Sequence, residues 1–134
     1  MKKIKRVVII GSGRWAKVLA TEVIKCLGHS VDVYFCVSLR TNEIRQWADT
    51  RDLLSRLQIV DKVPLADDHG VCVAIVANSA HDHEKSIRDA LLKGYHVIVE
   101  KPFTTSSEQS QQAIEFAHRL GRAVFSANTY KFAS

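Results

Sequence analysis

The sequence has few of the features that mark a secreted or membrane protein. It contains three cysteines and no apolar run that approaches about 18 residues, the length of a membrane-spanning helix. Cys26, Cys36 and Cys72 are odd in number and lack C-x-x-C spacing, so we expect reduced core residues rather than disulfides. The start is basic, but the apolar segment behind it stops at Gly11 without a cleavage-type sequence. We therefore expect a cytoplasmic protein with no membrane contact.

The charge balance and the histidines limit the classes of partner that the chain could bind. Lys and Arg number 19 against 14 Asp and Glu, which gives a net charge of +5 and suits an anionic ligand. No cluster of Lys and Arg is interleaved with aromatic residues, so nucleic acid is not an expected partner. The run His81-Asp82-His83 has no third or fourth ligand at a useful spacing, and we expect no metal.

Apolar runs that are typical of strands alternate with amphipathic segments along the 134 residues. The pattern predicts strands at 7–11, 31–37, 59–63, 71–76, 95–99 and 123–125. Helices are predicted at 14–27, from Thr41 as a cap, at 80–93, and from a cap at Thr105 or Ser106 to 120. This alternation favours a doubly wound α/β fold, with a mainly parallel sheet and helices on both faces. The first helix is expected to bury Trp15, Val18, Leu19, Val23, Cys26 and Leu27.

A glycine-rich turn joins the first strand to the first helix. Gly11-Ser12-Gly13-Arg14-Trp15-Ala16 has the G-x-G-x-x-A form of the Rossmann dinucleotide fingerprint. Gly11 permits a sharp turn, and Gly13 leaves no Cβ between the backbone and a pyrophosphate. Unpaired N–H groups at the start of the helix attract an anion. The fingerprint predicts cofactor contacts from residues 11–15, and the alternative is a plain strand–helix turn.

The segment after the second strand bears on which dinucleotide binds. A site for NAD requires Asp or Glu there to hold the ribose 2′-hydroxyl, but this chain has Ser38-Leu39-Arg40-Thr41. Asp32 lies at the wrong end of the strand. Hydrogen bonds from Ser38 and Thr41 and a charged pair with Arg40 would suit a 2′-phosphate. We predict that NADP(H) binds more tightly than NAD(H); the alternative is a polar loop that caps the next helix.

From about Val71 onward the chain resembles the Gfo/Idh/MocA family of nicotinamide-dependent oxidoreductases. The resemblance rests on His83, Ala90-Leu91, Gly94, His96 and Glu100-Lys101-Pro102, which fall at the spacings of the family pattern. Where the family usually has Thr-Pro, this chain has Asn78-Ser79, which leaves a more polar loop. With the glycine turn included, the resemblance covers nearly all of the chain.

The resemblance implies a site at the carboxyl ends of the strands. Lys101 would lie beside the nicotinamide and the substrate as the catalytic residue, and Glu100 would position it. Asn78, Ser79, His83 and Pro102 would line the cofactor loop, and the Lys101–Pro102 bond is a candidate for the cis form. The expected reaction transfers hydride to or from a hydroxyl/carbonyl or amine/imine carbon.

The resemblance also implies a second, substrate-binding domain. Residues 1–127 would form the dinucleotide domain, and residues 128–134 resemble the start of the crossing to a second domain that is absent here. A small-molecule substrate would then be held by that missing domain or by a partner chain. We expect cofactor binding with little or no turnover from these residues alone, and self-association through the uncovered surface to form a homo-oligomer. The alternative function is a non-catalytic dinucleotide-sensing or partner-binding module.

Overall fold

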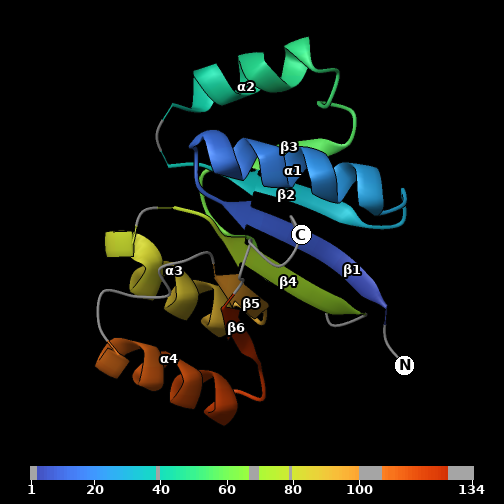
Figure 1. The fold of residues 1–134 in the computed structure, drawn as a ribbon. Coiled ribbons are helices and arrows are strands. Elements are labelled where there is room, and N and C mark those ends of the chain that lie inside the picture. The colour runs from blue at the N-terminus through green and yellow to red at the C-terminus, as the bar shows by residue number, and fades with distance from the viewer. Residues whose placement is uncertain (1–2, 39, 67–69, 79, 100–106, 127–134) are drawn as a thin grey trace, which may run out of the picture.

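The computed structural model describes residues 3–38, 40–66, 70–78, 80–99 and 107–126. Within them strands and helices alternate along the chain (Figure 1). The elements are β1 (Ile4–Ile10), α1 (Arg14–Cys26), β2 (Asp32–Cys36), α2 (Thr41–Thr50), β3 (Leu57–Val60), β4 (Val71–Val76), α3 (Ala80–Leu92), β5 (His96–Val99), α4 (Ser107–Arg119) and β6 (Val124–Ser126). The predicted elements are confirmed, with ends displaced by a few residues.

The strands form one sheet in the order β3-β2-β1-β4-β5-β6, and every pairing is parallel. All their carboxyl ends therefore lie along one edge. The chain runs outward from β1 to β3 and then returns to β4 on the other side of β1. The strand order thus reverses between β1 and β4, which is where doubly wound sheets bind ligands.

Both faces of the sheet are covered, which explains why its strands are apolar at consecutive positions. Val7 and Ile9 of β1 belong to a core cluster with α1 and α2. Val8 and Ile10 point the other way, into a cluster with α3 and α4. Figure 1 shows the two helix pairs on opposite sides of the sheet. The doubly wound fold predicted from the sequence is confirmed.

The connection from β3 to β4 contains no helix in its described residues, 61–66 and 70. Polar contacts hold it against the α3 face instead. The Tyr95 hydroxyl donates to the Pro64 carbonyl at 2.8 Å, and Nη1 of Arg6 donates to the Leu65 carbonyl at 2.7 Å. The Ala66 amide donates to the Lys93 carbonyl at 2.9 Å. Burial raises the pKa of the Tyr95 phenol, which keeps this hydroxyl protonated as a donor.

The predicted buried face of α1 is confirmed only in part. Val23 and Leu27 are partly buried against the core, whereas Trp15 is 45% exposed and Val18 is 39% exposed. The buried residues are Ala16, Ala20 and Ile24, which the prediction did not include. Small side chains at positions 16 and 20 allow the helix to pack close to the sheet, so Trp15 and Val18 lie on the outer surface.

Cys26, at the end of α1, is exposed as well, which corrects its predicted place in the core; Cys36 and Cys72 are buried as expected. At α2 the predicted cap Thr41 is the first helical residue, and Arg40 is the N-cap with a positive φ of 61°. None of the described helices combines the length and apolar character that crossing a membrane would take.

We predict that Tyr95→Phe weakens the hold on the β3–β4 connection. The substitution keeps the ring but removes the hydroxyl that bonds the Pro64 carbonyl, so the free energy of unfolding should fall by about 1 kcal/mol. Urea unfolding of the protein measures this change. The control is Tyr34→Phe, which keeps the ring that lies 4.9 Å from the Arg6 guanidinium. Equal stability of Tyr95→Phe and the wild type would contradict the prediction.

Candidate functional site

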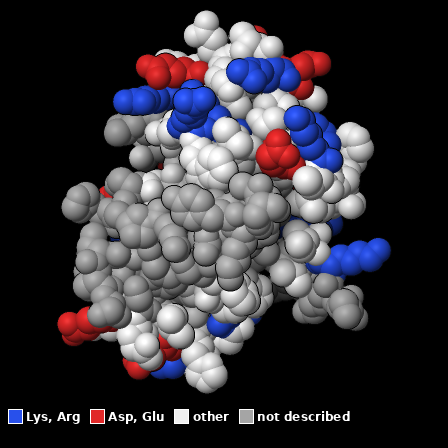
Figure 2. Space-filling model, viewed as in Figure 1, with Lys and Arg blue, Asp and Glu red and all other residues white. Residues whose placement is uncertain are grey.

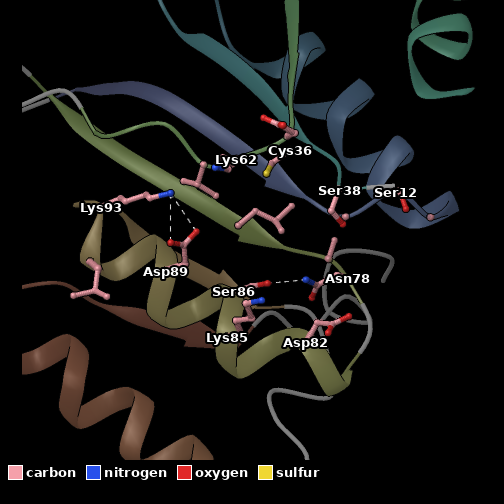
Figure 3. A pocket seen from close by; sticks show the side chains of 17 residues that line it. Ser12, Cys36, Ser38, Lys62, Asn78, Asp82, Lys85, Ser86, Asp89 and Lys93 are labelled. Carbon is pink, nitrogen blue, oxygen red and sulfur yellow. Dashed lines mark hydrogen bonds and ion pairs between the residues drawn. The ribbon is translucent and has the colours of Figure 1, made fainter. Parts of the chain in front are cut away.

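A cleft of about 880 Å³ lies at the carboxyl edge of the sheet. Its walls come from the glycine turn, the ends of β2, β3 and β4, and one face of α3 (Figure 3). The lining residues are Ile10, Gly11, Ser12, Gly13, Cys36, Ser38, Asp61, Lys62, Val63, Ala77, Asn78, Asp82, Lys85, Ser86, Asp89, Leu92 and Lys93. A smaller hollow of about 420 Å³ on α4 contains none of the predicted site residues; it is lined by Ile114, Glu115, His118 and Arg119.

Gly11 is required by the close approach of two strand ends. Its φ is +145°, and a Cβ there would lie 2.8 Å from the Ala77 carbonyl oxygen. The Gly11 amide donates to the Cys36 carbonyl at 3.1 Å, and the Ala77 amide donates to the Ile10 carbonyl at 2.8 Å. Gly11 thus joins the ends of β1, β2 and β4 at the point where the strand order reverses.

Gly13 has a different role, because nothing in the protein lies where its side chain would be. It is the N-cap of α1, with φ −81° and ψ −178°, and a Cβ built on it has no atom within 4 Å. No side chain caps the helix, and its first turn contains no acidic residue. The N–H groups at the start of α1 are therefore free to hold an anion that approaches through the cleft. This open cradle fits a dinucleotide pyrophosphate.

The residues predicted to recognise a 2′-phosphate are close in the chain but differ in whether they line the cleft. Ser38 is exposed and lines the cleft. Arg40 is exposed at the N-cap of α2, and Thr41 is half-buried in its first turn; neither is among the lining residues. Arg14 and Trp15 are also exposed and do not line the cleft.

The loop after β4 is fixed to α3 by two hydrogen bonds. Nδ2 of Asn78 donates to Oγ of Ser86 at 2.7 Å. Nε2 of His83 donates to the Asn78 carbonyl at 2.8 Å, and His83 is fully buried. His83 therefore supports the loop after β4 and is not among the lining residues of the cleft, whereas Asn78 is.

Four predicted site residues, Ser79, Glu100, Lys101 and Pro102, lie outside the described residues. The same holds for the proposed cis bond, for the cap at Thr105 or Ser106, and for residues 128–134. β5 ends at Val99, directly before Glu100, and pairs in parallel with β4. The roles of these residues stay predictions.

The cleft residues that follow β3 and those on α3 were not predicted from the sequence. Asp61 and Lys62 come directly after β3, whose end was not sharply defined by the sequence pattern. On α3, residues 82, 85, 86 and 89 recur every three or four positions, and Lys93 continues this spacing directly after the helix; this is the spacing of one helix face and the signal that could have identified them. Nζ of Lys93 lies 3.4 Å from Oδ1 of Asp89.

Cys36 lines the cleft without offering a reactive thiol. Burial, followed by the negative charge of Asp89, raises the pKa of the thiol to about 11. The group is therefore protonated at neutral pH, and thiolate chemistry is not expected there. Across the described residues, no three His, Cys, Asp or Glu side chains are grouped to hold a metal ion.

The charged groups are mixed on the surface seen in Figure 2. Over α1 and α2, in the upper part of the view, Lys and Arg side chains alternate with Asp and Glu. This part of the surface does not form the single-sign basic patch that typically binds a nucleic-acid backbone.

The model of a family described as "oxidoreductase family, NAD-binding Rossmann fold" (Gfo/Idh/MocA) matches residues 5–128. The fold is similar to that of an NAD-binding protein from Listeria innocua (24% identity, TM-score 0.71), covering 92% of this chain and 35% of that one. GenD2 from gentamicin A biosynthesis, solved with NAD, has 23% identity and a TM-score of 0.74, and the match covers 95% of this chain and 35% of GenD2. KijD10, a 3-ketoreductase from Actinomadura kijaniata solved with NADP and TDP-benzene, has 24% identity and a TM-score of 0.73. The match covers 92% of this chain and 37% of KijD10.

The chain thus spans about a third of the length of these solved proteins. No curated protein matches it.

We predict that the two glycines of the turn respond differently to alanine. Gly11→Ala places a Cβ against the Ala77 carbonyl at a positive φ, so unfolding should become easier by at least about 2 kcal/mol. Gly13→Ala enters open space, and the free energy of unfolding should stay within about 1 kcal/mol of the wild type. Gly13→Ala should nevertheless weaken binding of NAD(P)H by at least about tenfold, because its methyl group occupies the anion cradle.

Chemical unfolding and fluorescence titration of each variant measure the two effects. Full cofactor affinity in a folded Gly13→Ala protein would contradict the assignment of this turn.

Proposed function

The chain belongs to the Gfo/Idh/MocA family of oxidoreductases with an NAD-binding Rossmann fold, and we propose that it binds NADP(H) in preference to NAD(H). In this proposal it is the cofactor-binding half of an enzyme that transfers hydride to or from a hydroxyl/carbonyl or amine/imine carbon. The uncapped start of α1, which opens on the cleft beside Gly13, is the observation that carries the proposal. The substrate would be held by residues outside this domain, in a second domain or a partner chain.

The position of the glycine turn in the sheet determines how a dinucleotide would lie. Its pyrophosphate would bind the N–H groups at the start of α1. β2 lies on one side of β1 and β4 on the other. The adenosine half would extend toward Ser38 at the end of β2, and the nicotinamide half would extend toward the ends of β4 and β5. The bound cofactor supplies or accepts the hydride, and the protein positions it.

Two features of the β2 end support NADP(H). Residues 37–42 contain no carboxylate, so nothing in this segment would bind a 2′-hydroxyl as Asp or Glu does or repel a 2′-phosphate. Ser38 lines the cleft, and the Arg40 side chain is exposed and takes part in no salt bridge among the described residues. A guanidinium that is free to turn toward the cleft can form a paired hydrogen bond with a phosphate.

We propose that Lys101 acts on the substrate. An ammonium group beside the nicotinamide can donate a proton to the oxygen or nitrogen that becomes negative as hydride arrives. The end of β5 at Val99 supports this role, because the chain leaves the sheet two residues before Lys101, at the edge shared with the glycine turn. Glu100 would position the ammonium, and Pro102 would turn the chain away.

We predict that Arg40→Ala reduces the preference for NADPH. Losing a charged hydrogen bond to the 2′-phosphate should weaken NADPH binding by about tenfold or more, while NADH binding changes by less than about twofold. Parallel titrations of the wild type and the variant with both cofactors measure this. Arg45→Ala is the matched control, because Arg45 is an exposed arginine of α2, the helix that Arg40 precedes. Equal affinity of the wild type for the two cofactors would contradict the proposed preference.

We predict that Lys101→Ala separates catalysis from cofactor binding. In the assembly that includes the substrate-binding residues, the rate should fall by about a hundredfold or more because the proton donor is lost, while the dissociation constant for NADPH should change little. Stopped-flow turnover and cofactor titration measure the two quantities, with Lys25→Ala on the surface of α1 as a control. A variant that keeps its full rate would instead favour a dinucleotide-sensing module.

A further inference from the structure

The start of β6 is joined to β5 by a side chain as well as by the main chain. The Val97 amide donates to the Ala123 carbonyl at 2.9 Å, as expected where two parallel strands begin to pair. The Ala123 amide, however, donates to Nδ1 of the His96 imidazole at 3.1 Å. The imidazole thus takes the place of a main-chain acceptor directly before β6.

This hydrogen bond fixes the protonation state of His96. A backbone amide can only donate, so Nδ1 must offer its lone pair, and the ring is neutral with its hydrogen on Nε2. Turning the ring over would put a carbon atom against the Ala123 amide and leave that amide without its acceptor. Protonation would place a hydrogen on each ring nitrogen, and the bond to Ala123 would be lost. The start of β6 therefore depends on a group that ordinarily titrates at about pH 6.5.

The surroundings of His96 oppose a positive charge on its ring. The side chain is half-buried. Nε of Arg122 donates to the Gly94 carbonyl at 3.0 Å, which holds the guanidinium beside the start of β5. Arg122 forms no salt bridge among the described residues, so its charge is not neutralised there. Burial, followed by the positive charge of Arg122, lowers the pKa of His96.

The other elements that pack against β5 do not offset this effect. On β4 the residue opposite His96 is Val73, which is uncharged, and β6 contains no ionisable side chain. At the end of α3, Lys93 is paired with Asp89 at 3.4 Å. The last turn of α4 contains an exposed histidine and an exposed arginine, residues 118 and 119, which add no negative charge. In the described part of the chain, the neutral ring is thus the favoured form.

β6 has little else to hold it if the imidazole bond is lost. It consists of three residues, Val124–Ser126, at one edge of the sheet, and among the described strands it pairs with β5 alone (Figure 1). Its middle residue, Phe125, is 60% exposed and contributes little apolar burial. β6 is also the last described element, so the residues after 126 connect to the domain through it.

We propose that His96 is a pH-dependent switch for β6, which holds the start of the strand as a neutral imidazole and releases it from β5 once protonated. In the released state His96 regains its ordinary affinity for a proton, so that state binds more protons than the paired one. Release is therefore favoured as the pH falls below about 6.5, and the pairing is complete above that range. Acid loosens the edge through which the chain continues and leaves β1 to β4 paired.

Hydrogen exchange followed by NMR on the full 134-residue chain tests this switch. Protection factors, which are corrected for the intrinsic pH dependence of exchange, are compared at about pH 7.5 and about pH 5. The amides of residues 123–126 should lose protection by about fivefold or more, the value of about one hydrogen bond, and those of β1 and β4 by less than about twofold. The loss should follow the titration of the His96 ring, observed in the same samples.

Two substitutions separate the acceptor at this position from its charge. His96→Asn keeps an oxygen where Nδ1 lies and cannot be protonated, so β6 should stay protected at both pH values. His96→Gln carries its amide further out, where Nε2 lies, so the Ala123 bond should be lost and protection should be low at both pH values. His118→Asn, which replaces an exposed histidine of α4, is the matched control and should keep the pH response of the wild type.

Protection of β6 that stayed constant with pH in the wild type, or that fell equally in His96→Asn, would overturn the proposal. The same holds if β1 and β4 lost protection together with β6, since the effect would then be general unfolding. Full protection of β6 in His96→Gln would also contradict it. All of these measurements use the protein without cofactor, so they are independent of the proposed binding of NADP(H).

Discussion

The approach of Gly11 to the carbonyl of Ala77 is the contact on which the site depends. It brings the ends of β1 and β4 so close that a Cβ would lie 2.8 Å from the carbonyl oxygen. This closeness places the start of α1 at the reversal of strand order, with its N–H groups directed at the cleft rather than at a capping side chain. The anion cradle is thus a consequence of main-chain packing, and the residues around it determine what the anion belongs to.

Much of this arrangement could be predicted from local patterns. The glycine turn, the apolar strands and the alternation of strand and helix depend on residues close in the sequence, and the sheet confirms them. Once the strands are known to be parallel, their carboxyl ends must share an edge, so residues 11–13, 38 and 78 could be expected together. The structure places all of them in the cleft lining.

The features that the sequence did not reveal depend on contacts between distant segments. The face of α1 was assigned to its bulky residues, yet close packing on the sheet favours Ala16 and Ala20 and leaves Trp15 outside. The described residues of the β3–β4 connection are held by Arg6 and Tyr95, which lie far from them in the chain. The charged face of α3 lines the cleft together with Asp61 and Lys62 of that connection, which come together only in the folded chain.

In the proposed function, backbone amides at the start of α1 bind the cofactor pyrophosphate. The most direct measurement follows the ¹H–¹⁵N resonances of the protein as NADPH is added. The largest shifts are expected at the amides of residues 11–16, with smaller shifts at Ser38 and Asn78 and none along residues 114–119 of α4. Binding that left residues 11–16 unshifted, or that centred on α4, would contradict it.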